Sequence, residues 1–546
     1  MAASTNLDNL GVQALRVADF KLGINTAIPP TEIQDNEVQD LLNFEFDDSG
    51  NISTRRGVTQ LSSDTFSNRI TSLHYFTVDA GEIGILLTEG TTLRIIETNG
   101  TGLTTLSGAL TLPNNTFWQW VTFGGLAIGV NGATSGDNPV RVNAAAAAAA
   151  LGGSPPRGKY IAVWNSRVWI ASASAFSRIH GSALGLPEDW TATGASGAVT
   201  IDIDTNDGDP ITGLFSTRDA LYVFKRRSIH RIVAFADPNT DANNLRREVV
   251  TKDIGCAGPY SIQQIPNDVV FLSDQGIASL SLVQNAEDFR TAFYSRNVKE
   301  LTNFPKTTLE IPSLFCDTGA QYWISLPTSV APNGNKMVYV LDYLRIDEGI
   351  VRWARFDGMV AGTAFTSFPG ASGKTYEIGA LNSGGANYQL FTYVPRLTTA
   401  LFSDTDSAAR AYTKAIAMKS YNGNAQLLKK YWHEWGVGIN LLSASAGVTV
   451  AYYFDQNINR GDSYSFGLTG VTTGALWAGG LWGAGLWGTT FSGKSDIVRE
   501  LKSNSFGRES QDVTFNISNA QAGEGFTIQD FMLWFTTKNN KKVTDV

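Results

Sequence analysis

Residues 211–235, ITGLFSTRDALYVFKRRSIHRIVAF, contain the pattern on which the fold of this chain depends. Three short runs of apolar, β-branched and aromatic residues are separated by polar turns, which is typical of short antiparallel strands. The pattern recurs from residue 70 to residue 393 about every 25 to 50 residues, which fits one four-stranded propeller blade per copy. The sequence therefore predicts a β-propeller of six or seven blades. The other copies are ITSLHYF…EIGILLTEGTTLRIIET (70–98), WQWVTFGGLAIGVNG (118–132), KYIAVWNSRVWIASASAFSRIHGS (159–182), IQQIPNDVVFLSDQGIASLSLV (262–283) and two looser ones at 309–358 and 361–393.

Two inserts interrupt this pattern. Residues 143–156, NAAAAAAALGGSPP, contain an alanine run that predicts one or two helical turns between blades, ended by the glycines and prolines that follow. Residues 236–253, ADPNTDANNLRREVVTKD, are polar and are expected to form a projecting loop.

The character of the chain changes after residue 400. Segments such as LLKKYWHEWGVGIN, GVTVAYYFD and GFTIQDFMLWFTTK alternate as the strands of a β-sandwich do. The loop GALWAGGLWGAGLWG (474–488) places a tryptophan at every fifth position, which suits neither a helix face nor a strand face. We expect this loop to bury its indoles against a neighbouring subunit. Its candidate interface residues are Trp477, Trp482 and Trp487.

The stretch before the blades, DFKLGINTAIPPTEIQDNEVQDLLNFEFDDSGNISTRRG (19–57), is polar and rich in turn residues. It predicts an extended arm over 20–30, one or two helical turns over 31–44 and a tight turn at 47–50. It contains neither a phosphate-binding glycine loop nor a Cys/His cluster, so we interpret it as an anchoring strap, either across the propeller or onto a neighbouring subunit. Its candidate interface residues are Phe20, Asn25, Arg55 and Arg56.

These patterns predict an all-β protein with three parts. They are an N-terminal arm (1–60), a β-propeller (61–399) and a C-terminal, sandwich-like β domain (400–546). The composition agrees: 43% of the residues are hydrophobic, while only 17% are charged, below the usual value of about 25%. With 54 glycines and 13 tryptophans, this is typical of a turn-dense protein whose surface is covered by partner subunits.

The net charge of −8 does not favour a nucleic-acid-binding face, although an acidic surface would let DNA slide past without sticking. Cys256 and Cys316 lie in different repeats and are expected to be reduced and buried. The start MAASTNLDNLGVQ has no basic and apolar regions of a signal peptide, and no apolar run is long enough to predict a membrane span. We therefore expect synthesis in the cytoplasm.

The acidic segment DIDTNDGD (202–209) resembles a calcium-binding loop at first sight. Asp207 stands where that loop needs glycine, and Gly213 stands where it needs a closing glutamate, so a polar turn explains the segment better. Whether the region of Asp202 and Asp204 binds a metal stays open. Asp202, Asp204 and Asp207 would also be the first carboxyl groups to test in a glycosidase.

The remaining candidates for chemistry have simpler interpretations. The segment 273–276, SDQG, lacks the spacing of an aspartate box and predicts a hairpin turn, and no Gly-x-Ser-x-Gly motif is present. The basic clusters at 225–227 and 246–247 predict solvated or salt-bridged hairpin tips. With no such motif present, the sequence predicts no catalytic, cofactor-binding or metal-binding residues. The four histidines lie in separate segments, without the spacing of metal ligands. These histidines are His74, His180, His230 and His433.

Several segments together resemble a known family, the nozzle or hub proteins in the tails of short-tailed phages, also called tail tubular B or DNA-stabilisation proteins. The resemblance covers about the first half of the chain and rests on the order of the segments, since no single one is specific. The segments are Gly23-Ile24-Asn25, Asp35-Asn36-Glu37 ahead of Asn43, Gly50 with Arg55-Arg56-Gly57, Arg167-Val168-Trp169-Ile170-Ala171, Ser182-Ala183-Leu184-Gly185-Leu186-Pro187-Glu188-Asp189-Trp190, Leu221-Tyr222-Val223-Phe224-Lys225 and Phe271-Leu272-Ser273-Asp274-Gln275-Gly276-Ile277.

The resemblance implies a virion protein without catalytic residues or cofactors. Six copies would form a ring around the DNA exit channel, below an adaptor ring and above a fibre or tip protein, and would retain the packaged genome. The DNA would pass without sequence-specific binding. Two other classes stay open, namely a carbohydrate-binding or glycan-degrading tail propeller and a secreted bacterial propeller, although the missing signal peptide weakens the last.

Overall fold

The protein is described here from a computed structural model, which falls into two compact units. Unit 1 comprises residues 1–57, 340–357 and 398–546, and unit 2 comprises residues 58–339 and 358–397. The division differs from the three predicted parts because the N-terminal stretch and residues 340–357 belong to the same unit as the C-terminal β region. The structure describes residues 12–47, 50–236, 244–285, 293–303, 311–326, 337–370, 373–381, 387–394, 402–405, 409–423, 428–443, 445–469, 498–501 and 509–537.

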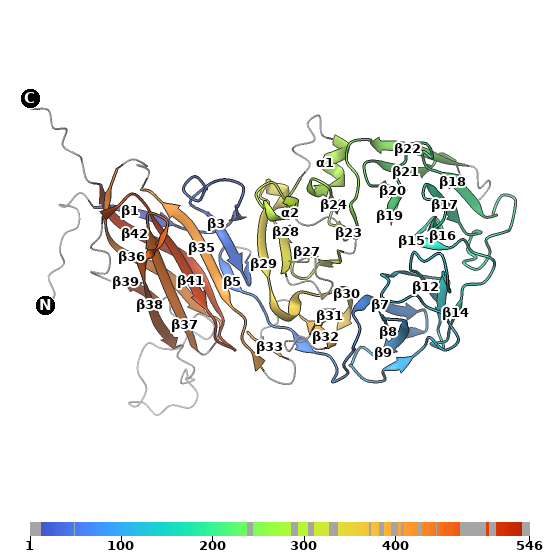
Figure 1. Ribbon diagram of the computed structural model, residues 1–546, viewed down its shortest axis with the longest axis horizontal. Coiled ribbons are helices and arrows are strands. Elements are labelled where there is room, and N and C mark those ends of the chain that lie inside the picture. Colours follow the sequence, from blue (N-terminus) through green and yellow to red (C-terminus); the bar gives the residue numbers. More distant parts are fainter. Residues whose placement is uncertain are drawn as a thin grey trace, which may run out of the picture. The chain divides into compact units, whose positions relative to one another are not determined.

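Unit 2 is a seven-bladed β-propeller, as far as its described strands show. Each inner strand contacts the inner strand of the next blade, and the seventh contacts the first, so the ring is closed (Figure 1). The propeller prediction is therefore confirmed, with the higher of the two predicted blade numbers. The inner strands are β7 (Ile70–Val78), β11 (Gln119–Phe123), β15 (Gly158–Trp164), β19 (Ile211–Ser216), β23 (Gly258–Ile265), β26 (Ser313–Cys316) and β30 (Ala364–Gly370).

Each blade is an antiparallel meander that starts at its inner strand. Blades 1 to 4 continue with β8 (Gly81–Glu89), β9 (Thr92–Ile96) and β10 (Thr104–Thr105); β12 (Leu126–Val130), β13 (Val140–Asn143) and β14 (Ala148–Ala150); β16 (Arg167–Ser172), β17 (Arg178–Gly181) and β18 (Val199–Asp202); and β20 (Ala220–Lys225), β21 (Ile229–Ala234) and β22 (Leu245–Thr251). Blades 5 to 7 continue with β24 (Asp268–Ser273) and β25 (Gly276–Ser279), followed by α1 (Leu280–Asn285) and α2 (Glu300–Asn303); β27 (Gln321–Leu326) and the start of β28 (Met337–Asp342); and β31 (Gly373–Leu381) and β32 (Tyr388–Tyr393). The short helix η4 (Gly358–Val360) precedes β30.

The last blade is completed by a strand from the N-terminal side of the propeller. Strand β6 (Thr59–Gln60) pairs antiparallel with β32, so the two ends of the propeller sequence meet in one sheet. Phe66 extends this pairing, since its backbone exchanges two hydrogen bonds of 2.8 and 2.7 Å with Tyr388. A buried apolar cluster that includes Ile70, Leu87 and Leu390 fills the space between blades 7 and 1. Burial of each such side chain stabilises the closed ring by about 1.5–3 kcal/mol.

Unit 1 contains two β-sheets that pack face to face. The ring of Phe531 on one sheet lies 4.7 Å from that of Phe515 on the other, and Trp435 also contacts Phe515. The predicted sandwich is thus confirmed. One sheet has the order β39 (Val498–Leu501), β36 (Lys430–Leu441), β42 (Phe526–Thr537), β5 (Ile52–Thr54), β4 (Phe44–Phe46), with β1 (Gln13–Val17) on β42 and β40 (Glu509–Ser510) on β36. The other has β29 (Arg352–Phe356), β3 (Glu37–Leu42), β35 (Lys414–Tyr421), β41 (Val513–Asn519), β37 (Ser445–Phe454), β38 (Asn457–Thr469), with β2 (Gly23–Ile24) on β3. Three short elements, η3 (Ile346–Glu348), β33 (Asp404–Thr405) and β34 (Ala409–Arg410), complete the unit.

The predicted helical turns over residues 31–44 are wrong. Glu37–Leu42 form strand β3, which pairs with β35 on one side and with β29 on the other. The turn at 47–50 is confirmed, because the backbone nitrogen of Gly50 donates to the carbonyl of Asp47 between β4 and β5. The described part of the N-terminal stretch thus contributes strands to both sheets of unit 1.

Strand pairing also overturns a second local prediction and part of a third. The alanine run contains a turn and strand β14, because pairing with β13 outweighs the helix propensity of alanine. Ala146 and Ala148 then pack against the cluster between blades 1 and 2. In the segment 236–253, Leu245–Thr251 form β22, the outer strand of blade 4, whereas residues 237–243 lie outside the described residues.

Candidate functional site

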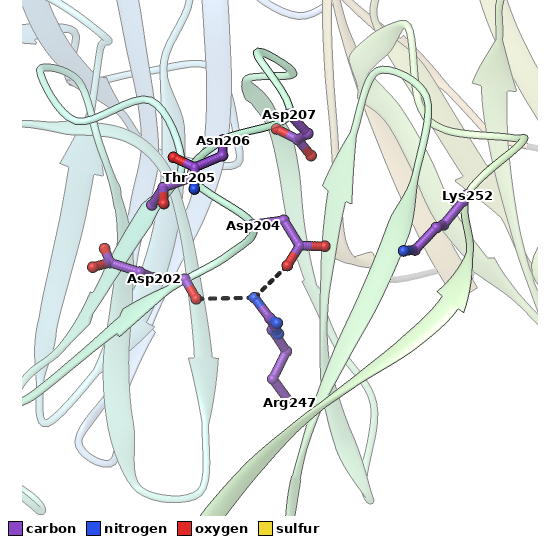
Figure 2. Close-up of a pocket in the computed structure, with 7 residues that line it drawn as sticks. All are labelled: Asp202, Asp204, Thr205, Asn206, Asp207, Arg247 and Lys252. Atoms are coloured by element: carbon purple, nitrogen blue, oxygen red, sulfur yellow. Dashed lines mark hydrogen bonds and ion pairs between the residues drawn. The ribbon is translucent and has the colours of Figure 1, made fainter.

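A polar pocket of about 500 Å³ lies where blade 3 passes into blade 4 (Figure 2). The acidic segment 202–209 forms one side of it, and Arg247 and Lys252 form the other. Lys252 also lines an adjoining pocket of about 390 Å³, together with Arg226 and Arg227. The acidic segment therefore does not stand alone but faces a row of basic side chains.

Each of three carboxylates in this segment forms an ion pair with a different basic side chain. Asp202 binds Arg178 through two hydrogen bonds of 2.6 and 2.9 Å, and Asp204 lies 2.7 Å from Arg247. The Arg178 hydrogen bonds lower the pKa of Asp202. Asp207 accepts from the Nζ of Lys225 at 2.6 and 2.7 Å, and the side chain of that lysine is fully buried. The segment is thus fixed by ion pairs onto blades 3 and 4.

This geometry argues against acid–base catalysis by the three aspartates that would be tested first. A glycosidase acid needs a raised pKa, so that the carboxyl group is protonated at neutral pH. Burial alone would raise the pKa of Asp207, but the hydrogen bonds from Lys225 lower it below its usual value. Among the described residues, no group of three or more His, Cys, Asp or Glu side chains is placed to hold a metal ion.

The other polar motifs of the propeller behave as turns and ion pairs. At the tip between β24 and β25, the Ser273 hydroxyl donates to the Gly276 carbonyl at 2.8 Å, which confirms the predicted hairpin turn. The carboxylate of Asp274 in that turn accepts two hydrogen bonds of 3.0 Å from Arg226. The basic clusters at 225–227 and 246–247 are likewise largely salt-bridged, as predicted, since Arg246 pairs with Glu248.

The structure places most of the predicted interface residues of the N-terminal stretch inside unit 1. Phe20 and Arg55 are fully buried, and Asn25 is 6% exposed. The side-chain nitrogen of Asn25 donates to Glu37 at 2.9 Å. Arg56 is half-buried, with its guanidinium 4.8 Å from the ring centre of Phe402. The candidates Trp477, Trp482 and Trp487 lie outside the described residues.

Arg55 is the centre of a buried polar network. Its guanidinium donates two hydrogen bonds of 2.9 Å to Asp404 and one of 2.7 Å to Asn43, and it lies 3.8 Å from the ring centre of Tyr412. Burial alone would lower the pKa of Arg55, but Asp404 raises it above its usual value. The arginine therefore stays charged and connects the N-terminal stretch to the C-terminal part of unit 1.

A second cavity, of about 200 Å³, lies on the propeller axis. Its lining residues come from five inner strands, β7, β11, β23, β26 and β30, or from the residues just before them. Phe117 of blade 2 and Tyr260 of blade 5 meet across the axis, with ring centres 5.2 Å apart. No sequence pattern predicted this cavity; Phe117, Trp118 and Trp120, directly before and within β11, form only one part of its lining.

Comparison with known proteins adds little to this picture. No family model and no curated protein matches the chain. Solved structures similar to it include the AfRom2 CNH domain, with 10% identity, a TM-score of 0.36 and coverage of 62% of this chain and 99% of that one. The Neurospora crassa Pan2 WD40 domain has 10% identity and a TM-score of 0.35, and the match covers 65% of this chain and 98% of that domain. Kluyveromyces lactis Hsv2 has 11% identity and a TM-score of 0.27, and the match covers 54% of this chain and 98% of that one. At these values the similarity supports no functional inference, and the fold rests on the strand pairing described above.

Proposed function

We propose that the protein is a structural subunit of the tail nozzle of a short-tailed phage. The proposal rests on the resemblance of the segments in the first half of the chain, and one structural observation supports it most. The N-terminal stretch, which carries much of that resemblance, is built into unit 1 through strands β3, β4 and β5 and through the buried Arg55–Asp404 pair. A stretch fixed in this way suits a rigid building block better than a flexible catalytic loop.

The proposed mechanism is passive. Six copies would surround the DNA exit channel in the virion, dock below an adaptor ring and carry a fibre or tip protein. The axis of each propeller is too narrow for this passage, because the rings of Phe117 and Tyr260 meet across it with their centres 5.2 Å apart, whereas the major groove of DNA alone is about 12 Å wide. The DNA would therefore run between the subunits of the ring, and the propellers would form its wall.

Imaging of the purified chain mixed with the adaptor protein of a short-tailed phage tests this proposal. A ring with a central channel supports it. A chain that forms no ring with its adaptor and cleaves glycans instead refutes it, in favour of the glycan-degrading propeller. The chain alone is the reference sample, because nozzle subunits can stay monomeric until the adaptor is present.

A further inference from the structure

The axial cavity of the propeller has the chemistry of a small-ligand site. None of its lining side chains is Asp, Glu, Lys or Arg. Its one histidine, His74, is neutral near pH 7, because burial lowers its pKa to about 4. The cavity therefore offers no charge to a phosphate, a carboxylate or a metal ion. It offers aromatic rings, hydroxyl groups and two amides instead.

The two amides are oriented by the backbone and present complementary groups. The Gln119 oxygen accepts a hydrogen bond of 3.2 Å from the backbone nitrogen of Ile161, which leaves its amide nitrogen as a donor. The Gln263 nitrogen donates at 3.3 Å to the carbonyl of Ser313, which leaves its oxygen as an acceptor. Among the described residues, neither of these remaining groups has a hydrogen-bond partner. A donor from blade 2 and an acceptor from blade 5 thus remain for a ligand.

The aromatic side chains favour a saturated ring over a flat base. Trp120 stacks with His74, with ring centres 6.3 Å apart, and with Trp118, with ring centres 5.3 Å apart. These contacts already use ring surface of Trp120 on which a nucleobase would have to stack. The edges of these rings can still contact the C–H groups of a sugar, while the amides bind its hydroxyl groups. A nucleotide would also bring a phosphate, for which no cation lines the cavity.

We propose that this cavity binds a single neutral sugar residue, either free or as the end of a glycan. Its volume of about 200 Å³ equals that of roughly seven water molecules at about 30 Å³ each, which suits one ring and not an oligosaccharide. The proposal concerns binding alone and does not depend on the role of the chain in a nozzle.

Saturation-transfer NMR on the full chain tests the proposal, with glucose, galactose, mannose and N-acetylglucosamine as probes and adenosine and inorganic phosphate as competitors. We expect saturable binding of at least one sugar. Gln119→Glu keeps the acceptor for Ile161 but loses the amide donor, so binding should weaken about tenfold. Gln264→Glu is the matched control, because Gln264 is an exposed amide that follows Gln263 on β23 and does not line the cavity, and it should leave binding unchanged.

A second variant, Gln263→Ala, keeps the test decisive if Gln119→Glu does not fold. It removes the acceptor from the opposite blade and should also weaken sugar binding about tenfold. Three results would overturn the proposal: no saturable signal from any of the four sugars, binding that neither variant weakens, or adenosine bound in place of the sugars.

Discussion

Replacing Arg55 by methionine should open unit 1 while the propeller stays closed. The substitution removes three short hydrogen bonds to Asp404 and Asn43 and leaves the carboxylate of Asp404, which is 4% exposed, without its cation. Removal of one partner of a buried ion pair costs about 3–5 kcal/mol. Since 1.4 kcal/mol corresponds to a factor of ten, amide hydrogen exchange in the affected strands should accelerate by a factor of about 10² to 4 × 10³.

Hydrogen-exchange mass spectrometry separates the two units because it reports on individual peptides. Peptides from β3 and β42 should lose protection in Arg55→Met, whereas peptides from β15 to β17 should not. Arg56→Met is the matched control, because its contact with the ring of Phe402 contributes only about 0.5–1 kcal/mol. The double variant Arg55→Met/Asp404→Leu should regain much of the lost protection, since an apolar pair can replace a buried ion pair. An acceleration of less than tenfold in unit 1, or equal changes in both units, would refute the reasoning.

Three further predictions follow from buried or paired groups in unit 2. Glu377 is fully buried, and neither of its carboxyl oxygens has a partner among the described residues. Burial raises the pKa of this carboxyl group, so the unfolded chain loses the proton at a lower pH than the folded chain does. The wild-type free energy of unfolding should thus fall by up to about 1.4 kcal/mol per pH unit above about pH 4.3. Urea titrations at several pH values should show that Glu377→Gln abolishes this part of the fall. The same pH dependence of the free energy of unfolding in both proteins would contradict the prediction. Lys225→Met should lower the free energy of unfolding by roughly 1–3 kcal/mol and speed proteolysis within 203–209, because Asp207 loses its buried partner. Unchanged cleavage would argue that the Lys225–Asp207 pair does not fix this segment. The imidazole of His74, with a pKa of about 4, should show constant NMR shifts from pH 5.5 to 8, and a midpoint near 6.5 would contradict the lowering of its pKa by desolvation.

The repeated strand pattern was sufficient to predict the propeller. Segments such as Leu221–Phe224 and Arg167–Ala171 lie in β20 and β16 because alternating β-branched and aromatic residues form strands that are buried between blades. The blade number could be limited only to six or seven, because the seventh sheet takes its outer strand, β6, from the opposite end of the propeller sequence. No local pattern indicates such a pairing.

The local errors have a common physical origin. In the stretch EVQDLL (37–42), the apolar residues Val38, Leu41 and Leu42 have a helical spacing, but pairing with β35 and β29 makes the stretch a strand. The alanine run has a high helix propensity, which pairing with β13 outweighs. Propensity acts within a few residues, whereas both of these strands are selected by their place in a sheet.

The candidate sites could be predicted only in part. The acidic segment 202–209 was correctly interpreted as a turn, but its cations, Arg178, Lys225 and Arg247, come from three other strands and could not be assigned to it. The axial cavity depends on five strands from five blades, so no single segment indicates it. Arg55 was identified as important, but its partner Asp404 lies 349 residues further along the chain.

Native mass spectrometry of the chain with the adaptor protein of a short-tailed phage tests the central claim, that this protein is a nozzle subunit, most directly. The proposal predicts a complex that contains six copies of the chain, and the same six copies in the presence of any of the four sugars. An adaptor ring that stays bare, or that binds single copies of the chain without contacts between them, would contradict it.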